Sequence, residues 1–271
     1  VEFAALRMPG TQEFFSTAER QVVYALDLDL MRRPAPAVEA RHSALLLIDL
    51  ELESAQQLAP QIFRRLQSLG WAVTPFTNPR FELGFSVERR LACLFGLDTC
   101  PPPVPLPVEP KPATANAVAD TLPNVDLAHF ETHASYGQDS GWQSYLRMPD
   151  GSQLGVRKLL SLPRVPRFTV LITCEGGTAG RGSVADDVSL AQAILLRGGE
   201  AVLASPHKLD ERLGARWVQA LYSSQASSLQ GGQEGPRPST DLRSTFAAAQ
   251  EFLRSSGAPM TDWSALRLFV P

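Results

Sequence analysis

The almost entirely apolar run at residues 44–50 does the most to constrain how this chain folds. A run of this length and composition suits a strand that is buried on both faces, as strands of parallel sheets are. Apolar residues at helical spacing follow it and stop at Gly70, a residue typical of a helix C-terminus. A second apolar run lies at 71–76. Strand, helix and strand in this order predict a βαβ unit, and hence a parallel sheet.

The rest of the chain continues this alternation of strands and helices. The apolar patterns predict further strands at 125–132, 168–173, 201–204 and 266–270, and helices at about 184–197, 211–222 and 241–253. A short helix capped by Thr114 precedes the first of these strands. The sequence therefore predicts an α/β fold of three layers, with helices on both sides of a mostly parallel central sheet.

The domain organisation follows from where these patterns begin and where they are interrupted. We expect one domain over residues 41–271, and we expect residues 1–40 to be a connector or the remnant of an upstream region. The chain begins at Val1 rather than Met, so a fragment of a longer protein is one interpretation that the sequence leaves open. Seven prolines fall within 98–112 and predict an extended insertion. The Ser-, Gln- and Gly-rich segment 223–239 is predicted to be flexible.

Composition excludes several classes of function. The net charge is −3 and no basic stripe is present, which argues against a nucleic-acid binder. No apolar stretch is long enough to cross a bilayer, and the first 30 residues lack a signal layout. Three cysteines, an odd number, disfavour a disulfide framework and predict a soluble cytoplasmic protein. No Cys/His pair has zinc-finger spacing, and no cofactor or metal is predicted.

Two of the predicted strands end in residues that can carry out nucleophilic catalysis. His133 follows one strand and Cys174 follows another. In an open α/β sheet, reactive groups gather beyond the carboxyl ends of the strands, so these side chains share one cleft if the strands are neighbours. An imidazolium near a cysteine holds it as the nucleophilic thiolate. From these residues alone, a structural cysteine with a hydrogen-bonded histidine is an equally acceptable interpretation.

Several segments together resemble one known family. His-Phe-Glu-Thr-His at 129–133 resembles the His-Phe-Ala-Thr-His motif of CHAT-domain peptidases, which are relatives of caspases and separases. Residues 173–177 are similar to the family's Ala-Cys-Glu-Thr-Gly box. The helix, Gly turn and strand at 190–205 also follow the family pattern, as do Ala-Ala-Ala-Gln at 247–250 and Trp263. The resemblance covers residues 42–271 and implies the caspase-like form of the three-layer fold.

The resemblance also implies roles for the site residues. Cys174 would be the nucleophile, His133 the general base, and the backbone N–H groups of Cys174 and Ala134 the oxyanion donors. The implied activity is that of a regulated, bacterial-type cysteine endopeptidase, which cleaves a protein partner and answers to an upstream sensor, in defence or cell-death signalling. The family usually has Gly where this chain has Ala134. The alternatives are a catalytically inactive scaffold and a hydrolase or acyltransferase that acts on small molecules.

Other polar residues have both a functional and a structural interpretation. Asp186, Asp210 and Glu211, with His207 nearby, are candidates for a pocket that binds a basic substrate side chain. The alternative is that the acids sit at helix starts in solvent and that His207 lies in a surface loop. His129 and His133 have His-x-x-x-His spacing, but in a strand they would stand about 13 Å apart, too far to share a zinc ion.

Overall fold

A large central sheet forms the middle of the protein. A computed structural model describes residues 24–25, 42–49, 52–77, 106, 108–137, 141–174, 176–178, 188–223 and 242–271. In these residues the sheet has eight strands: β1 (Tyr24–Ala25), β2 (Ser43–Ile48), β3 (Ala72–Thr77), β4 (Lys111–Pro112), β5 (Leu127–Glu131), β9 (Phe168–Ile172), β10 (Ala201–Ala204) and β11 (Arg267–Val270).

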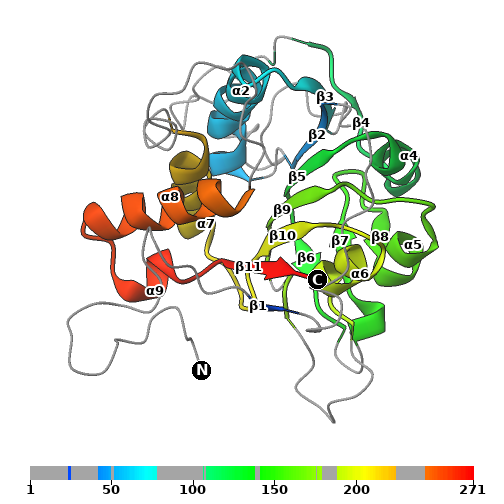
Figure 1. The fold of residues 1–271 in the computed structure, drawn as a ribbon. Helices are drawn as coiled ribbons and strands as arrows, with labels where there is room; N and C mark the ends of the chain where they lie inside the picture. The colour runs from blue at the N-terminus through cyan, green and yellow to red at the C-terminus, as the bar shows by residue number, and fades with distance from the viewer. Residues whose placement is uncertain are drawn as a thin grey trace, which may run out of the picture.

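The strand order is β1-β11-β10-β9-β5-β2-β3-β4 (Figure 1). Every neighbouring pair is parallel except β10 and β11, which are antiparallel. The prediction of a mostly parallel sheet is therefore confirmed. The order also makes β5 and β9 neighbours near the centre of the sheet, which is the condition that the sequence left open for His133 and Cys174 to share a cleft.

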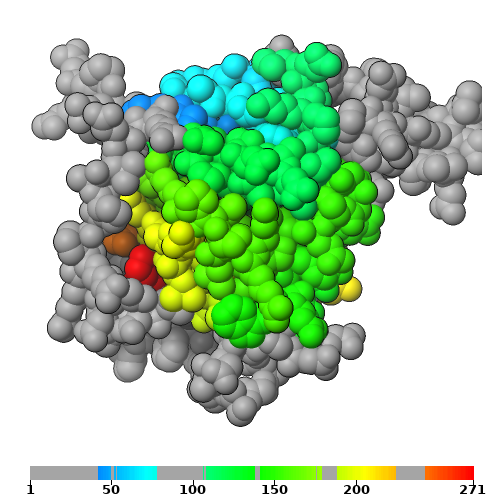
Figure 2. Space-filling model, turned by 90° about the vertical axis from the view of Figure 1, so that its right-hand side faces the viewer, coloured from blue at the N-terminus to red at the C-terminus, as the bar shows by residue number. Residues whose placement is uncertain are grey.

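Helices cover both faces of this sheet. One face carries α2 (Glu53–Ser68), α7 (Glu211–Tyr222), α8 (Leu242–Ser255) and α9 (Met260–Trp263), and the other α4 (Ala115–Thr121), α5 (Val156–Ser161) and α6 (Leu190–Leu196). Alternate residues of β2 enter separate cores: Leu46 packs with the α2, α7 and α8 side, and Leu45 packs with the α4, α5 and α6 side. The predicted three layers are confirmed. Figure 2 shows the face over α4 and α5, where the middle of the chain covers the sheet.

A second, smaller sheet leaves the main sheet directly after β5. It consists of β6 (Ala134–Ser135), β7 (Tyr145–Arg147) and β8 (Gln153–Gly155), all antiparallel. The sequence analysis did not predict it, because strands of two or three residues are too short to show a periodic pattern. Short 3₁₀ helices, η2 (Leu122–Asn124) and η3 (Gly141–Gln143), stand before β5 and before β7.

Some predicted segments fall largely outside the described residues. Of residues 1–40, only β1 is described, and it pairs with β11 at the edge of the sheet. The end of the Pro-rich segment forms β4 beside β3, while 98–105 and 107 lie outside the description, as do 224–239. The predicted helix at 184–197 is described from Ser189, which caps α6. No described helix is long and apolar enough to cross a membrane.

Candidate active site

The pairing of β5 with β9 brings the ends of these two strands together. Their register runs from Leu127 opposite Phe168 to Glu131 opposite Ile172. Carried two residues further, the same register sets His133 beside Cys174. Because side chains alternate between the faces of a strand, both residues belong to the face that α2 and α7 cover.

A cavity of about 140 Å³ lies at this edge of the sheet. His133 and Cys174, both partly buried, line it together. The remaining lining comes from the ends of β5 and β9, the start of α2 and the start of α7: Leu52, Ser54, Glu131, Thr132, Ile172, Thr173, Leu209, Asp210, Glu211 and Gly214. Gly214 leaves room for this arrangement, since a Cβ there would come within 3.1 Å of the Ile172 side chain.

The thiol of Cys174 is held close to the start of α7. Its Sγ donates a hydrogen bond to the Leu209 carbonyl at 3.4 Å. The chain beyond it turns through two closely packed glycines, Gly176 and Gly177. A Cβ on Gly177 would lie 2.7 Å from the Phe269 ring, and the Gly177 N–H donates to the Ser205 carbonyl at 2.8 Å. Gly177 is therefore held at a position where only glycine fits.

The small sheet fixes the backbone on the His133 side. The Arg147 N–H donates to the His133 carbonyl at 2.8 Å, and the Thr132 hydroxyl donates to the Arg147 carbonyl at 2.6 Å. Ala134 then stands opposite Leu146 at a non-hydrogen-bonded position of the ladder. At such a position the N–H points away from the partner strand, so β7 does not engage the Ala134 N–H.

The predicted pocket residues divide into three groups. Asp210 and Glu211 line the cavity, and each also accepts hydrogen bonds from the first residues of a helix. The Asp210 carboxylate caps α7 by accepting from the N–H groups of Arg212 and Leu213, and one Glu211 oxygen accepts from the N–H and hydroxyl of Ser54. His207 is exposed and is not part of the described lining. Asp186 lies outside the described residues.

The sequence analysis missed a buried acid in the cavity wall. Glu131 is 2% exposed and lines the cavity, and its Oε2 has no hydrogen-bond partner in the part of the chain that the structure describes. Residues 129, 131 and 133 alternate with the apolar partners on β5, so strand periodicity alone already puts Glu131 on the face of His133. This period-two placement is the signal that could have identified it.

Behind Glu131, two more buried polar side chains extend the site inward. His129 Nδ1 is 3.0 Å from the Tyr222 hydroxyl, and His129 Nε2 is 3.9 Å from Glu131 Oε2. Burial, together with the negative charge of Glu131, raises the pKa of Tyr222. The phenol is therefore neutral, and the tautomer of His129 decides which of the two groups donates. Among the described residues, no group of three or more His, Cys, Asp and Glu is arranged to hold a metal ion.

The fold and the paired strands define an α/β protein of caspase-like architecture. The family model of the CHAT domain matches residues 1–266. The chain belongs to the CHAT-domain family. The match includes residues 1–40, which the sequence analysis assigned to a connector, and the boundary at 40 stays a prediction. The comparison with curated proteins finds no match.

The comparison with solved structures finds two neighbours that cover most of this chain. Separase, in its complex with securin from Saccharomyces cerevisiae, matches with a TM-score of 0.50 at 10% identity, over 86% of this chain and 12% of the separase chain. The complex of the pro- and mature domains of Porphyromonas gingivalis RgpB matches with a TM-score of 0.47 at 14% identity, over 84% of this chain and 47% of that one. This chain thus spans less than half of either neighbour.

Proposed function

We propose that this CHAT domain is a cysteine endopeptidase in which Cys174 is the nucleophile and His133 the general base. The observation that carries the proposal is the shared cavity, in which both residues stand at the ends of adjacent parallel strands. Membership of the CHAT family and the caspase-like fold support a cysteine-protease type of chemistry. The proposed substrate is an extended segment of a protein partner.

The proposed reaction proceeds through an acyl-enzyme. His133 takes the proton of the Cys174 thiol, and the thiolate attacks the carbonyl carbon of the scissile bond. The oxygen of the tetrahedral intermediate accepts hydrogen bonds from the N–H groups of Cys174 and Ala134. His133 then returns the proton to the leaving amine as the C–N bond breaks. Water, activated by His133, hydrolyses the thioester and regenerates the thiol.

Two features of the backbone support these roles. The ladder position of Ala134 leaves its N–H unused by β7, so a residue other than Gly after His133 still supplies a donor. The packing of Gly177 against Phe269 and Ser205 holds the backbone three residues beyond Cys174. Preorganised donors of this kind stabilise a developing oxyanion without rearranging during the reaction. Control by an upstream sensor, a cytoplasmic location and a role in defence or cell death are proposed on the family resemblance alone.

The test is a peptide-library cleavage profile of the wild-type protein beside Cys174→Ala and His133→Asn. We expect cleavage to fall at least about a thousandfold in both variants, since losing either the nucleophile or the base disables the whole unit. His42→Asn is the matched control, because His42 is an exposed histidine at the opposite end of β2 with a φ of 48°, which asparagine tolerates.

Three outcomes contradict the proposal. Cleavage that persists in Cys174→Ala removes the nucleophile assignment. A wild-type protein that cleaves no peptide, and whose Cys174 resists alkylation, is an inactive scaffold. Turnover of small esters without peptide cleavage indicates a small-molecule hydrolase that uses the same thiol.

A further inference from the structure

The cavity of Cys174 and His133 is strongly acidic. Three carboxylates line it, those of Glu131, Asp210 and Glu211. The described lining contains no lysine or arginine. A site that gathers like charges without a counter-charge is destabilised until a cation enters, so this composition selects for a positively charged occupant.

The two outer acids are partly used by the protein itself. Asp210 Oδ1 caps α7, and Glu211 Oε1 accepts from Ser54 at the start of α2. Both residues are exposed, so water screens their remaining charge. They form the rim of the cavity, where they attract a cation but do not discriminate strongly between cations.

Glu131 is different, because it is buried and no described residue forms a hydrogen bond to its Oε2. Burying a polar atom without a hydrogen bond raises the free energy of the folded state, and native proteins rarely contain such an atom without a functional reason. His129 Nε2 lies 3.9 Å from Glu131 Oε2, beyond hydrogen-bond distance. Both atoms are buried without a hydrogen-bond partner among the described residues, so at this distance the imidazole does not satisfy the carboxylate.

Glu131 lies where a substrate side chain that extends past Cys174 into the cavity would end. Glu131 precedes His133 by two residues on the same face of β5, and Ile172 precedes Cys174 by two residues on β9. All four line the cavity, which therefore extends down the face of the sheet by two residues, or about 7 Å at 3.3 Å per residue. The wall beyond Cys174 is apolar at Ile172 and Leu209, which suits the aliphatic stem of a long basic side chain.

We propose that Glu131 determines the specificity of this site, and that the cavity takes the arginine or lysine side chain of the residue whose carbonyl group Cys174 attacks. The inference rests on the proposed peptidase function and names its substrate class. The stem packs against Ile172 and Leu209, and the charged end meets the free oxygen of Glu131. An organic cation is favoured over a metal ion, because the described residues offer no set of three metal ligands.

The test compares peptides that differ at this one position, with arginine, lysine, citrulline or glutamate. Citrulline keeps the shape of arginine but carries no charge. We expect the wild-type kcat/KM to be about 30-fold or more higher for arginine than for citrulline, the ratio that a buried charge pair supports. Glu131→Gln, which preserves shape, should lower kcat/KM for arginine to the level of citrulline, so that the ratio between the two peptides falls to about one.

Glu251→Gln is the matched control, since Glu251 is paired with Arg254 on α8 and does not line the cavity. This variant should retain the preference for arginine. Equal wild-type rates for arginine and citrulline peptides would overturn the inference and leave the peptidase proposal intact. A Glu131→Gln protein that folds and still prefers arginine would do the same.

A binding measurement separates this inference from the proposed function. Fluorescence anisotropy with labelled arginine and citrulline peptides is done on Cys174→Ala and on Cys174→Ala combined with Glu131→Gln. If no peptide is ever cleaved, tighter binding of arginine that disappears with Glu131→Gln still supports a cation-recognition cavity. If Cys174→Ala binds both peptides equally, the inference fails whatever happens to catalysis, and whether or not the double variant folds.

Discussion

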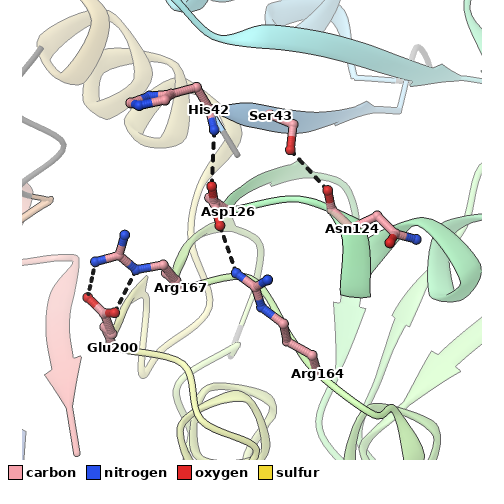
Figure 3. Close-up of polar contacts among 7 residues, drawn as sticks. All are labelled: His42, Ser43, Asn124, Asp126, Arg164, Arg167 and Glu200. Atoms are coloured by element: carbon pink, nitrogen blue, oxygen red, sulfur yellow. Dashed lines mark hydrogen bonds and ion pairs between the residues drawn. The ribbon is translucent and has the colours of Figure 1, made fainter. Parts of the chain in front are cut away.

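A buried carboxylate lies at each end of strand β5, and the two differ in their hydrogen bonds. Asp126, just before the strand, is 1% exposed, and Glu131, its last residue, is 2% exposed. Asp126 Oδ1 accepts from the Arg164 guanidinium at 2.7 Å, and Oδ2 accepts from the His42 N–H at 3.1 Å (Figure 3). Glu131 Oε2, by contrast, accepts from none of the described residues.

The surroundings of the two carboxylates repeat this difference. Near Asp126, Arg167 binds Glu200 through two hydrogen bonds of 2.6 and 3.0 Å, which raise the pKa of Arg167 (Figure 3). At the other end, the Thr173 hydroxyl beside Cys174 is also buried, and no described residue is its hydrogen-bond partner. The charged side chains around Asp126 are paired, which favours stability. The Cys174 end retains unsatisfied polar groups in a cavity, a feature that stability alone does not favour.

The largest effect on stability is expected for Asp126→Ala, at the end of β5 where the buried carboxylate is hydrogen-bonded. The substitution leaves the Arg164 charge and the His42 N–H without their acceptor. Arg164 is 23% exposed and recovers part of its solvation, so we expect unfolding to become easier by about 2–4 kcal/mol. Urea denaturation measures this. Asp120→Ala, an exposed aspartate on α4, should stay within about 0.5 kcal/mol of wild type. If Asp126→Ala lowers the free energy of unfolding no more than Asp120→Ala does, then the hydrogen bonds of Asp126 do not stabilise the fold.

The central strands and α7 are the part of the molecule that sequence describes best. Buried parallel strands are nearly continuous apolar runs, and for that reason β2, β9 and β10 could be predicted within a residue or two. Helix α7 was predicted at its described bounds, because Asp210 is a strong helix cap and the apolar spacing is regular. Strands β6 to β8 could not be predicted, since their stability comes from pairing with one another rather than from a local pattern.

The candidate site was predicted only in part, for a related reason. His133 and Cys174 each follow an apolar run, so the local sequence is enough to identify each as a candidate at the end of a strand. Their closeness depends on β5 pairing with β9, a contact between distant segments that no local pattern specifies. Glu131 sits inside a run that reads as a buried strand, and nothing in the sequence indicates that its carboxylate lacks a partner. The division of Asp210 and Glu211 between capping and cavity lining likewise depends on how α2 and α7 meet.

A smaller effect is expected from Tyr222→Phe, which tests the polar cluster behind Glu131. Removing the hydroxyl leaves His129 Nδ1 without its hydrogen bond and should lower the free energy of unfolding by about 1 kcal/mol near neutral pH. The pKa of Tyr222 is raised above its ordinary 10.0 in the folded protein, so the neutral phenol contributes stability that is complete below about pH 10 and declines above it.

The phenylalanine variant lacks this alkaline decline. The stability difference between Tyr222→Phe and wild type should therefore shrink as the pH rises from about 8 to about 11. Urea titrations at several pH values measure it. Two curves that remain parallel over this range would mean that the Tyr222 hydroxyl ionises as easily in the folded protein as in the unfolded chain, and that Glu131 does not act on it.

The smallest effect, and the one of opposite sign, is expected at the unsatisfied end. Glu131→Gln removes a buried charge that has no hydrogen-bonded partner at Oε2, and it preserves volume and shape. We expect the free energy of unfolding to be unchanged or to rise by up to about 1 kcal/mol at neutral pH, as it does when a functional charge is removed. Urea denaturation beside Asp126→Asn, the equivalent isosteric change at the other end of β5, gives the direct comparison.

The sign of this small change decides what Glu131 is for. A loss of stability above about 1 kcal/mol would mean that its charge is balanced by His129, 3.9 Å away, in a structural ion pair. No loss, together with a loss at Asp126→Asn, would mean that one strand carries a stabilising carboxylate at its start and a destabilising one at its end. A destabilising carboxylate beside Cys174 is accounted for by what it binds, and the basic side chain of a substrate is the occupant whose charge would balance it.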